Sequence, residues 1–178
     1  MSAASATASR GTPKARVLSV RRNKGAPADN VDAMYGVDEL VSILPQCDYV
    51  VVATPNTLET IRFFGQAHFD AMKPTAVLVN VARGKCIQEE PPHEALTTGR
   101  LRGFAADVWS RYEFRQSFPI GYMSRLEVHK LPNVIGSLGE RGNTDDVLER
   151  HLQFGCENIS DFALGRTIRR EVNLDLGY

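Results

Sequence analysis

An arginine at the end of an apolar stretch is the first residue in this chain whose type and position could do chemistry. Arg83 follows residues 76–82, an apolar run that only Asn80 interrupts. A run of this kind without alternation is typical of a strand covered on both faces, as in a parallel sheet. Arg83 would then lie at the carboxyl end of the strand, where open α/β sheets bind ligands. The planar guanidinium group of Arg83 can bind a carboxylate and keeps its positive charge, although it could also form a structural ion pair.

Four segments that follow one another along the chain carry a resemblance to a known family. They read VVVATPNTLET (50–60), MKPTAVLVNVARG (72–84), LRGFAADVW (101–109) and LPNVIGS (131–137). Each is a weak signal alone, but their order and spacing together are specific. The chain resembles the later part of the nucleotide-binding domain of the D-isomer-specific 2-hydroxyacid dehydrogenases, over roughly residues 16–173.

The resemblance implies an α/β fold, an incomplete Rossmann-like doubly wound parallel sheet that lacks the first strand and the glycine-rich loop. The sequence contains no G-x-G-x-x-G motif, the loop that brings backbone N–H groups to the pyrophosphate at a helix N-terminus. We expect a disordered leader over residues 1–15, a partial NAD(P)-binding domain over 16–173 and a tail over 174–178. Without the first strand, the strand at 16–20 would pair with the next available neighbour or stay unpaired.

Apolar runs and turn residues predict the elements that would position Arg83. Asp38 is the predicted cap of the first helix, and Gly99 is the predicted end of the second. The apolar face of the last helix would carry Leu148, Leu152, Ile159 and Phe162. The strands are expected at 16–20, 48–54, 76–82, 101–108 and 133–137, the helices at 37–44, 88–98 and 143–164, helical pieces over 58–72 and an irregular loop over 109–132.

The resemblance also assigns residues to a nicotinamide dinucleotide cofactor. At the end of the strand at 16–20 the chain offers Arg21 and Arg22 and no carboxylate, which favours NADP over NAD, although two arginines there could also be a solvated turn. Asp107, at the end of the strand at 101–108, would hold the nicotinamide amide or cap the turn at Trp109. The remaining predicted cofactor-binding residues are at the carboxyl ends of two other strands: Thr54 and Pro55, in a loop that in the family lies against the adenosine side of the cofactor, and Val81 and Ala82.

The activity that the resemblance implies is NAD(P)-dependent reduction of 2-keto acids, or the reverse oxidation of 2-hydroxy acids. Arg83 would be the catalytic residue that orients the carboxylate and polarises the carbonyl. The family's proton donor is a histidine after the last strand, and NVIGSLGERG places Gly139 at that position. The glutamate that keeps this histidine basic is replaced by Tyr112, with Glu113 one residue later. We therefore expect the chain alone to be inactive.

Two further residues are candidates for chemistry, and two other functions of the chain fit the sequence. His129 could swing toward Arg83 as a substitute proton donor, and Cys86 could be reactive if the arginine stabilised its thiolate. Alternatively, the chain is a truncated, inactive remnant, or a module that docks on a full-length relative through an unpaired sheet edge. An unpaired edge also makes a homo-oligomer possible.

Composition limits the class of protein. With 178 residues, 43% of them hydrophobic, the chain can bury one core. Its formal net charge is zero, which gives no general attraction to nucleic acid or a membrane. Three cysteines without metal-site spacing are typical of a reduced intracellular protein, here expected in the cytoplasm. Residues 1–15 contain Ser, Ala and Arg but no acidic residue, the composition of an organelle transit peptide or of a disordered leader.

Overall fold

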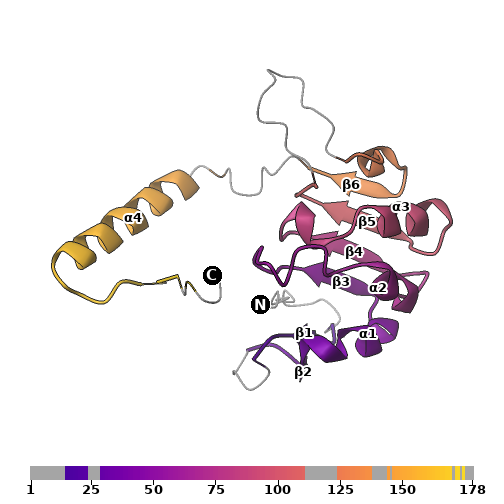
Figure 1. Cartoon of the computed structure of the whole chain (residues 1–178), viewed down its shortest axis with the longest axis horizontal. Helices are drawn as coiled ribbons and strands as arrows, with labels where there is room; N and C mark the ends of the chain where they lie inside the picture. Colours follow the sequence, from indigo (N-terminus) through magenta and orange to yellow (C-terminus); the bar gives the residue numbers. More distant parts are fainter. Residues whose placement is uncertain are drawn as a thin grey trace. The chain divides into compact units, whose positions relative to one another are not determined.

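The structure, a computed structural model, describes residues 15–23, 29–110, 124–137, 144, 146–169, 171–172 and 174. It comprises two compact units, one ending at Ser137 and the other beginning at Leu138 (Figure 1). The domain limits expected at residues 16 and 173 stay a prediction.

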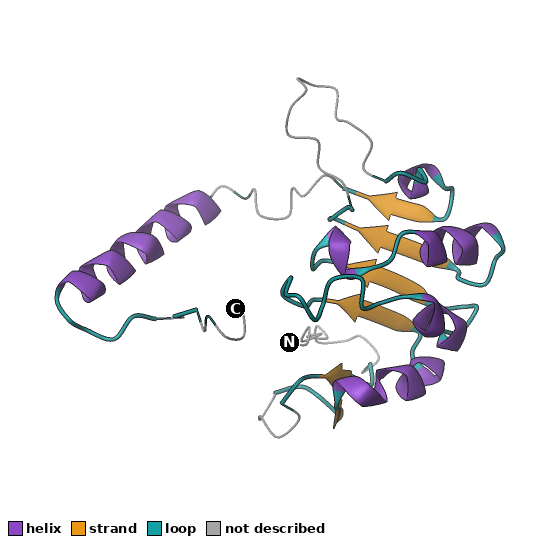
Figure 2. Ribbon diagram, in the orientation of Figure 1, coloured by secondary structure: helices purple, strands orange, loops and turns teal. Residues whose placement is uncertain are grey.

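A four-stranded parallel sheet forms the centre of the first unit (Figure 2). Its strands, in spatial order, are β3 (Tyr49–Val52), β4 (Val77–Asn80), β5 (Gly103–Ala106) and β6 (Val134–Gly136). The register pairs Val52 with Asn80, Asn80 with Ala106 and Ala106 with Gly136. All four strands therefore end at the same level, and their carboxyl ends form one continuous edge. This confirms the α/β prediction and each of these strands.

A second, two-stranded parallel sheet lies earlier in the chain. It pairs β1 (Leu18–Val20) with β2 (Ala33–Tyr35). The backbone N–H of Arg21 extends the pairing by donating to the Tyr35 carbonyl at 3.0 Å. The strand expected at 16–20 is thus present and paired. Its partner β2 was not predicted, because it is defined by its pairing with β1 and not by an apolar run of its own.

Short helices connect the strands. They are η1 (Val37–Glu39), α1 (Leu40–Ile43), η2 (Leu44–Gln46), α2 (Gln66–Ala71), η3 (Gly84–Cys86), α3 (Glu90–Thr97) and η4 (Val128–Lys130). The prediction that Asp38 caps the first helix is wrong, because Asp38 lies inside the first turn. The carboxylate of Glu39 instead accepts a 2.8 Å hydrogen bond from the Gly36 N–H. Gly99 follows α3 with a φ of +74°, as expected of a residue at a helix end.

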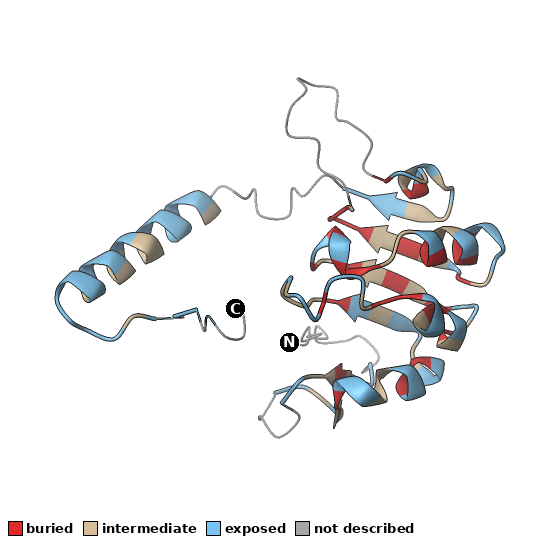
Figure 3. Cartoon of the chain, viewed as in Figure 1, coloured by how far each residue is buried: buried red, intermediate tan, exposed pale blue. Residues whose placement is uncertain are grey.

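The core lies between the four-stranded sheet and the helices α1, α2 and α3, which cover the same face of it (Figure 3). Leu44, Phe64, Leu78 and Leu101 are its largest fully buried apolar side chains. On the other face the exposures of three β3 and β6 side chains are high: Tyr49 67%, Val51 46% and Ile135 78%. Within the described part of this unit, the expectation that apolar strands are covered on both faces is therefore wrong for β3.

In the described part of the second unit, residues 147–163 form helix α4 (Val147–Ala163), and short segments are described on either side of it. The guanidinium of Arg169 lies 5.4 Å from the centre of the Phe154 ring, and its backbone N–H donates to the Asn158 side chain at 3.3 Å. The helix confirms the prediction for 143–164 over most of its length. Its predicted apolar face is exposed within this unit, at Leu148, Leu152, Ile159 and Phe162. In the portion of the chain that the structure describes, no helix is both long and apolar enough to cross a membrane.

The turn after β4 depends on a glycine for space. A Cβ atom at Gly84 would lie 1.9 Å from the backbone C and O atoms of Trp109. We predict that Gly84→Ala lowers the free energy of unfolding by about 3 kcal/mol or more, because the backbone itself would have to move. Gly155→Ala is the control, since no heavy atom lies within 4 Å of its Cβ position in α4. Urea denaturation measures both, and equal stability of the two variants would contradict the argument.

Candidate functional site

The four strands end at the same position in the ladder, and their aligned carboxyl ends bring the predicted cofactor-binding segments together. The parallel ladder continues one residue beyond the strands, because Val81 N–H donates to the Val52 carbonyl at 3.1 Å. In the same way Asp107 N–H donates to the Asn80 carbonyl at 3.2 Å. The segment after β4 is thus hydrogen-bonded to the end of β3, and the segment after β5 to the end of β4. Thr54, Val81 and Asp107 therefore lie at one sheet edge, as the sequence predicted.

Asn80 fixes the turn that carries Arg83. Its side chain is 1% exposed, and its Oδ1 accepts a 3.1 Å hydrogen bond from the Ala82 N–H. Its Nδ2 donates to the Arg83 carbonyl at 3.3 Å. The two bonds satisfy a backbone donor and a backbone acceptor that would otherwise be unpaired in the turn. Sequence reasoning gave Asn80 no role, although a polar residue near the end of an apolar strand was a visible signal.

Arg83 itself reaches the surface at this edge. Its residue is exposed, and its guanidinium donates a 2.7 Å hydrogen bond to the carbonyl of the neighbouring Ala82. Ala82 itself is buried, but a carboxylate is a stronger acceptor for a guanidinium than a backbone carbonyl is. Arg83 therefore has the accessibility that a substrate-binding arginine needs. Its predicted catalytic role stays a prediction.

Asp107 is held by a residue from the neighbouring strand. Asp107 is 8% exposed, and its Oδ1 accepts a 2.5 Å hydrogen bond from the hydroxyl of Ser137. Ser137 also accepts a 2.8 Å hydrogen bond through its carbonyl from the indole Nε1 of Trp109. These bonds tie the segment after β5 to the end of β6 and set the orientation of the Asp107 carboxylate. Ser137 was not among the predicted site residues.

The loop after β3 is organised by a buried threonine. Thr60 is 1% exposed, and its hydroxyl donates to the Pro55 carbonyl at 2.6 Å. The same hydroxyl accepts a 2.7 Å hydrogen bond from the Thr57 N–H. These bonds within the loop stabilise its conformation. Thr54 and Pro55 are placed as predicted, while the role of Thr60 was missed.

Cys86 is a packing residue in this structure. Its side chain is completely buried, and the Thr54 hydroxyl points at its sulfur at 3.6 Å. A reactive thiol needs access to its partner in the reaction. The hypothesis of a reactive Cys86 is therefore not supported by the structure.

An ion pair links the segment after β1 to this loop. Arg22 is bound by the carboxylate of Glu59, which directly precedes Thr60. The two residues are separated by 37 positions in the sequence. Arg22, predicted to meet the ribose phosphate of NADP, thus lies beside the loop that the resemblance assigns to the adenosine side. The backbone of Arg21 is held by Tyr35 of β2.

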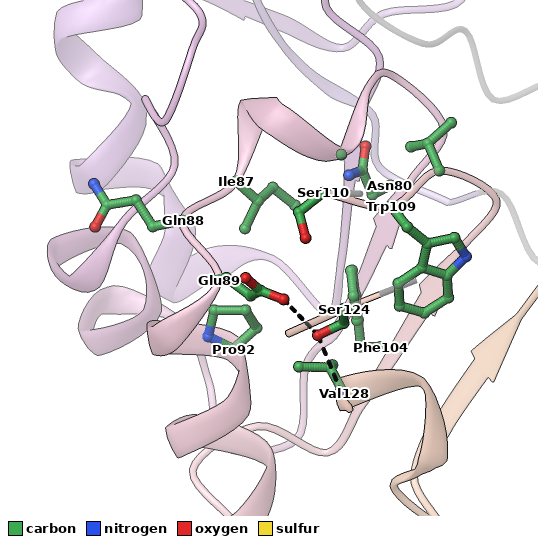
Figure 4. Close-up of a pocket in the computed structure, with 12 residues that line it drawn as sticks. Asn80, Ile87, Gln88, Glu89, Pro92, Phe104, Trp109, Ser110, Ser124 and Val128 are labelled. Carbon is green, nitrogen blue, oxygen red and sulfur yellow. Dashed lines mark hydrogen bonds between the residues drawn. The ribbon is translucent and has the colours of Figure 1, made fainter. Parts of the chain in front are cut away.

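A pocket lies beside the turn that carries Arg83, and its empty space of about 340 Å³ includes open solvent (Figure 4). Its polar wall is Glu89, whose carboxylate accepts hydrogen bonds from the Ser124 hydroxyl at 2.6 Å and from the Arg125 N–H. Burial raises the pKa of Glu89, but these hydrogen bonds outweigh it, so the pKa lies below its usual value. Glu89 thus acts as an ionised anchor that holds residues 124–128 against α3. The other residues that line the pocket are Asn80, Gly84, Ile87, Gln88, Pro92, Phe104, Val108, Trp109, Ser110 and Val128.

The predicted position of the proton donor lies outside the described residues, and the suggested substitute, His129, packs against an indole. The ring of His129 packs edge-on against Trp109, with the centroids 5.8 Å apart, so its described contact is with the indole. Gly139, Tyr112 and Glu113 lie outside the described residues. Within the described ranges, no group of three or more His, Cys, Asp or Glu side chains is arranged to hold a metal ion.

Comparison with known proteins agrees with this architecture. Residues 4–137 match the family model described as D-isomer specific 2-hydroxyacid dehydrogenase, NAD binding domain. The chain belongs to this family. The match starts earlier than the resemblance seen in the sequence, which began at residue 16.

Individual members of the family show how much of them the chain represents. A glyoxylate reductase from Pyrococcus furiosus is 39% identical over 137 residues, which are 77% of this chain and 38% of that protein. The crystal structure of a D-isomer specific 2-hydroxyacid dehydrogenase family protein from Aeromonas salmonicida matches with a TM-score of 0.72 and 28% identity. The match covers 90% of this chain and 48% of the Aeromonas chain. The chain spans between about a quarter and a half of the length of the curated relatives that it matches.

More distant structures share the fold. An NADPH-dependent glyoxylate/hydroxypyruvate reductase from Sinorhizobium meliloti, solved with NADP and sulfate, has a TM-score of 0.74 and 23% identity. The aligned region covers 92% of this chain and 49% of the reductase chain. At this identity the likeness concerns the Rossmann-like architecture alone.

The Asn80 clamp can be tested by its removal. We predict that Asn80→Ala lowers the free energy of unfolding by about 2–3 kcal/mol, because the Ala82 N–H and the Arg83 carbonyl both lose a buried partner. Asn56→Ala, in the exposed part of the loop after β3, should change stability by no more than about 0.5 kcal/mol. Urea denaturation followed by circular dichroism compares them. A loss at Asn80 as small as that at Asn56 would show that the clamp is not needed.

Proposed function

We propose that the chain is the nicotinamide-dinucleotide-binding part of a 2-hydroxyacid dehydrogenase, and that it takes NADP in preference to NAD. One observation carries the proposal: the predicted cofactor segments after β3, β4 and β5 converge at one level edge of a parallel sheet. Ligands bind at this edge in open α/β sheets, because helices cover the faces and leave the strand ends accessible.

The preference for NADP rests on the segment after β1. This segment reads Arg21, Arg22, Asn23, and it lacks the carboxylate that would accept hydrogen bonds from a ribose 2′-hydroxyl. A guanidinium binds a phosphate with two parallel hydrogen bonds and a full opposite charge. Arg22 is the better placed of the two arginines, because its ion pair with Glu59 brings it to the loop that would face the adenosine.

In the complete reaction Arg83 would bind the carboxylate of a 2-keto acid and draw negative charge toward the developing alkoxide. Asn80 would keep the backbone of Arg83 in place through its bond to the Arg83 carbonyl. Asp107, buried and oriented by Ser137, would accept a hydrogen bond from the nicotinamide amide. The cofactor supplies the hydride when it is bound.

Turnover by this chain alone is not part of the proposal. Gly139 has no side chain that could donate a proton, and His129 packs against Trp109. The relatives whose names state a reductase activity are also two to three times longer than the matched region. We propose that the proton and most of the substrate pocket come from residues outside this unit, on this protein or on a partner.

The second candidate is an interaction module that docks through the edge of β3. Val77 and Val81 donate to the carbonyls of Asp48 and Val52, so the alternate residues of β3 direct their backbone groups away from β4. In the described four-stranded sheet, β3 is the terminal strand. A strand edge of this kind is a template for pairing with another chain.

A thermal melt distinguishes the two candidates. We predict a cooperative transition, followed by circular dichroism, that moves to higher temperature with NADPH and moves less with NADH. A ligand at a hundred times its Kd stabilises the folded state by about 2.7 kcal/mol, which gives a shift of several degrees. Sedimentation velocity of the same sample reports its oligomeric state. A melt that neither cofactor moves, together with a dimer or larger species, would contradict the cofactor proposal and favour the interaction module.

A further inference from the structure

The ion pair between Arg22 and Glu59 connects two segments of the expected adenosine site. Arg22 follows β1 and Glu59 lies in the loop after β3. The Arg22 side chain is 31% exposed and that of Glu59 is 67% exposed. The pair is therefore accessible to solvent and to a ligand, and it is not a buried structural bridge.

The loop holds Glu59 where Arg22 can reach it. Thr60 is buried and donates to the Pro55 carbonyl, while its own N–H donates to the Thr57 carbonyl at 3.0 Å. These bonds fix the backbone on the C-terminal side of Glu59. The carboxylate is thus presented by a formed turn, which lowers the entropy cost of pairing with Arg22.

A carboxylate and a phosphate compete for the same guanidinium. Both bind its planar fork through charge-assisted hydrogen bonds, and the donors that face one anion are not available to the other. A phosphate that approached Arg22 would also be repelled by the negative charge of Glu59 at close range. NADP differs from NAD by a 2′-phosphate, whereas NAD offers no charged group at that position.

We propose that Glu59 is a specificity-determining residue that competes with the 2′-phosphate of NADP(H) for Arg22. This inference rests on the proposed cofactor-binding function. Glu59 weakens the preference for NADP that Arg22 provides, because the phosphate must first displace the carboxylate. NAD(H) has no 2′-phosphate and does not need to displace the carboxylate. The ion pair therefore reduces the difference in affinity between NADP(H) and NAD(H).

The test is Glu59→Gln, which keeps the size of the side chain and removes its charge. We expect its Kd for NADPH to be about three- to tenfold lower than that of the unchanged protein. The reason is that the phosphate no longer has to break an exposed ion pair and is no longer repelled by a negative charge. Its Kd for NADH should change by less than about twofold. Isothermal titration calorimetry at low ionic strength measures both, since salt screens such interactions. In the double variant Arg22→Gln, Glu59→Gln the gain for NADPH should disappear.

Asp48→Asn is the matched control. Asp48 forms a 2.8 Å ion pair with Lys73, and the side-chain exposures of Lys73 and Asp48 are 33% and 69%, nearly those of Arg22 and Glu59. This variant should leave both cofactor affinities unchanged. A thermal melt of each variant establishes that it is folded.

The outcomes separate the two claims. If NADPH binds the unchanged protein and Glu59→Gln equally well, or if NADH gains as much as NADPH, the inference about Glu59 is wrong while cofactor binding stands. If neither cofactor binds any of the folded variants, the proposed function fails and this inference fails with it.

Discussion

Four parallel strands that stop at the same level are the constraint on which the rest of the first unit depends. Val52, Asn80, Ala106 and Gly136 lie side by side in the ladder. Because parallel strands point the same way, every segment that follows them starts from this one edge. A shift of one residue in any pairing would turn its side chains to the opposite face and move the segment behind it. The ladder therefore sets both the core and the position of Arg83.

Close packing around Trp109 fixes the edge once the ladder has formed. A Cβ atom at Gly136 would lie 2.6 Å from the Cζ2 atom of Trp109, so the indole occupies the space that a larger residue would need. Gly84 meets the backbone of Trp109 in the same close manner. Trp109 is 4% exposed and donates to the Ser137 carbonyl. Two glycines and one tryptophan thus pack the ends of β4, β5 and β6 together, beside the hydrogen bond from Ser137 to Asp107.

The strands and the edge could be predicted from the sequence because their signals are local. Apolar runs identified β3 to β6, and their order within the family placed Arg83 and Asp107 at the same edge. Hydrogen bonds between distant residues left no such signal. The bond from Ser137 to Asp107 joins residues 30 apart, and the Arg22–Glu59 pair joins residues 37 apart. The strand β2 and the anchor between Glu89 and Ser124 were missed for the same reason: each is defined by its partner rather than by its own sequence.

The central claim is that the sheet edge binds a nicotinamide dinucleotide, and NMR of the 15N-labelled protein titrated with NADPH tests it most directly. We predict that the largest amide shifts fall on residues 53, 54, 56 and 57, on 81–84 and on 106–108, with smaller shifts at 21–23. Amides on the opposite side of the core, such as those of Phe69 and Leu96 in α2 and α3, should stay in place. Shifts confined to those helices, or no shifts at millimolar NADPH, would contradict the claim.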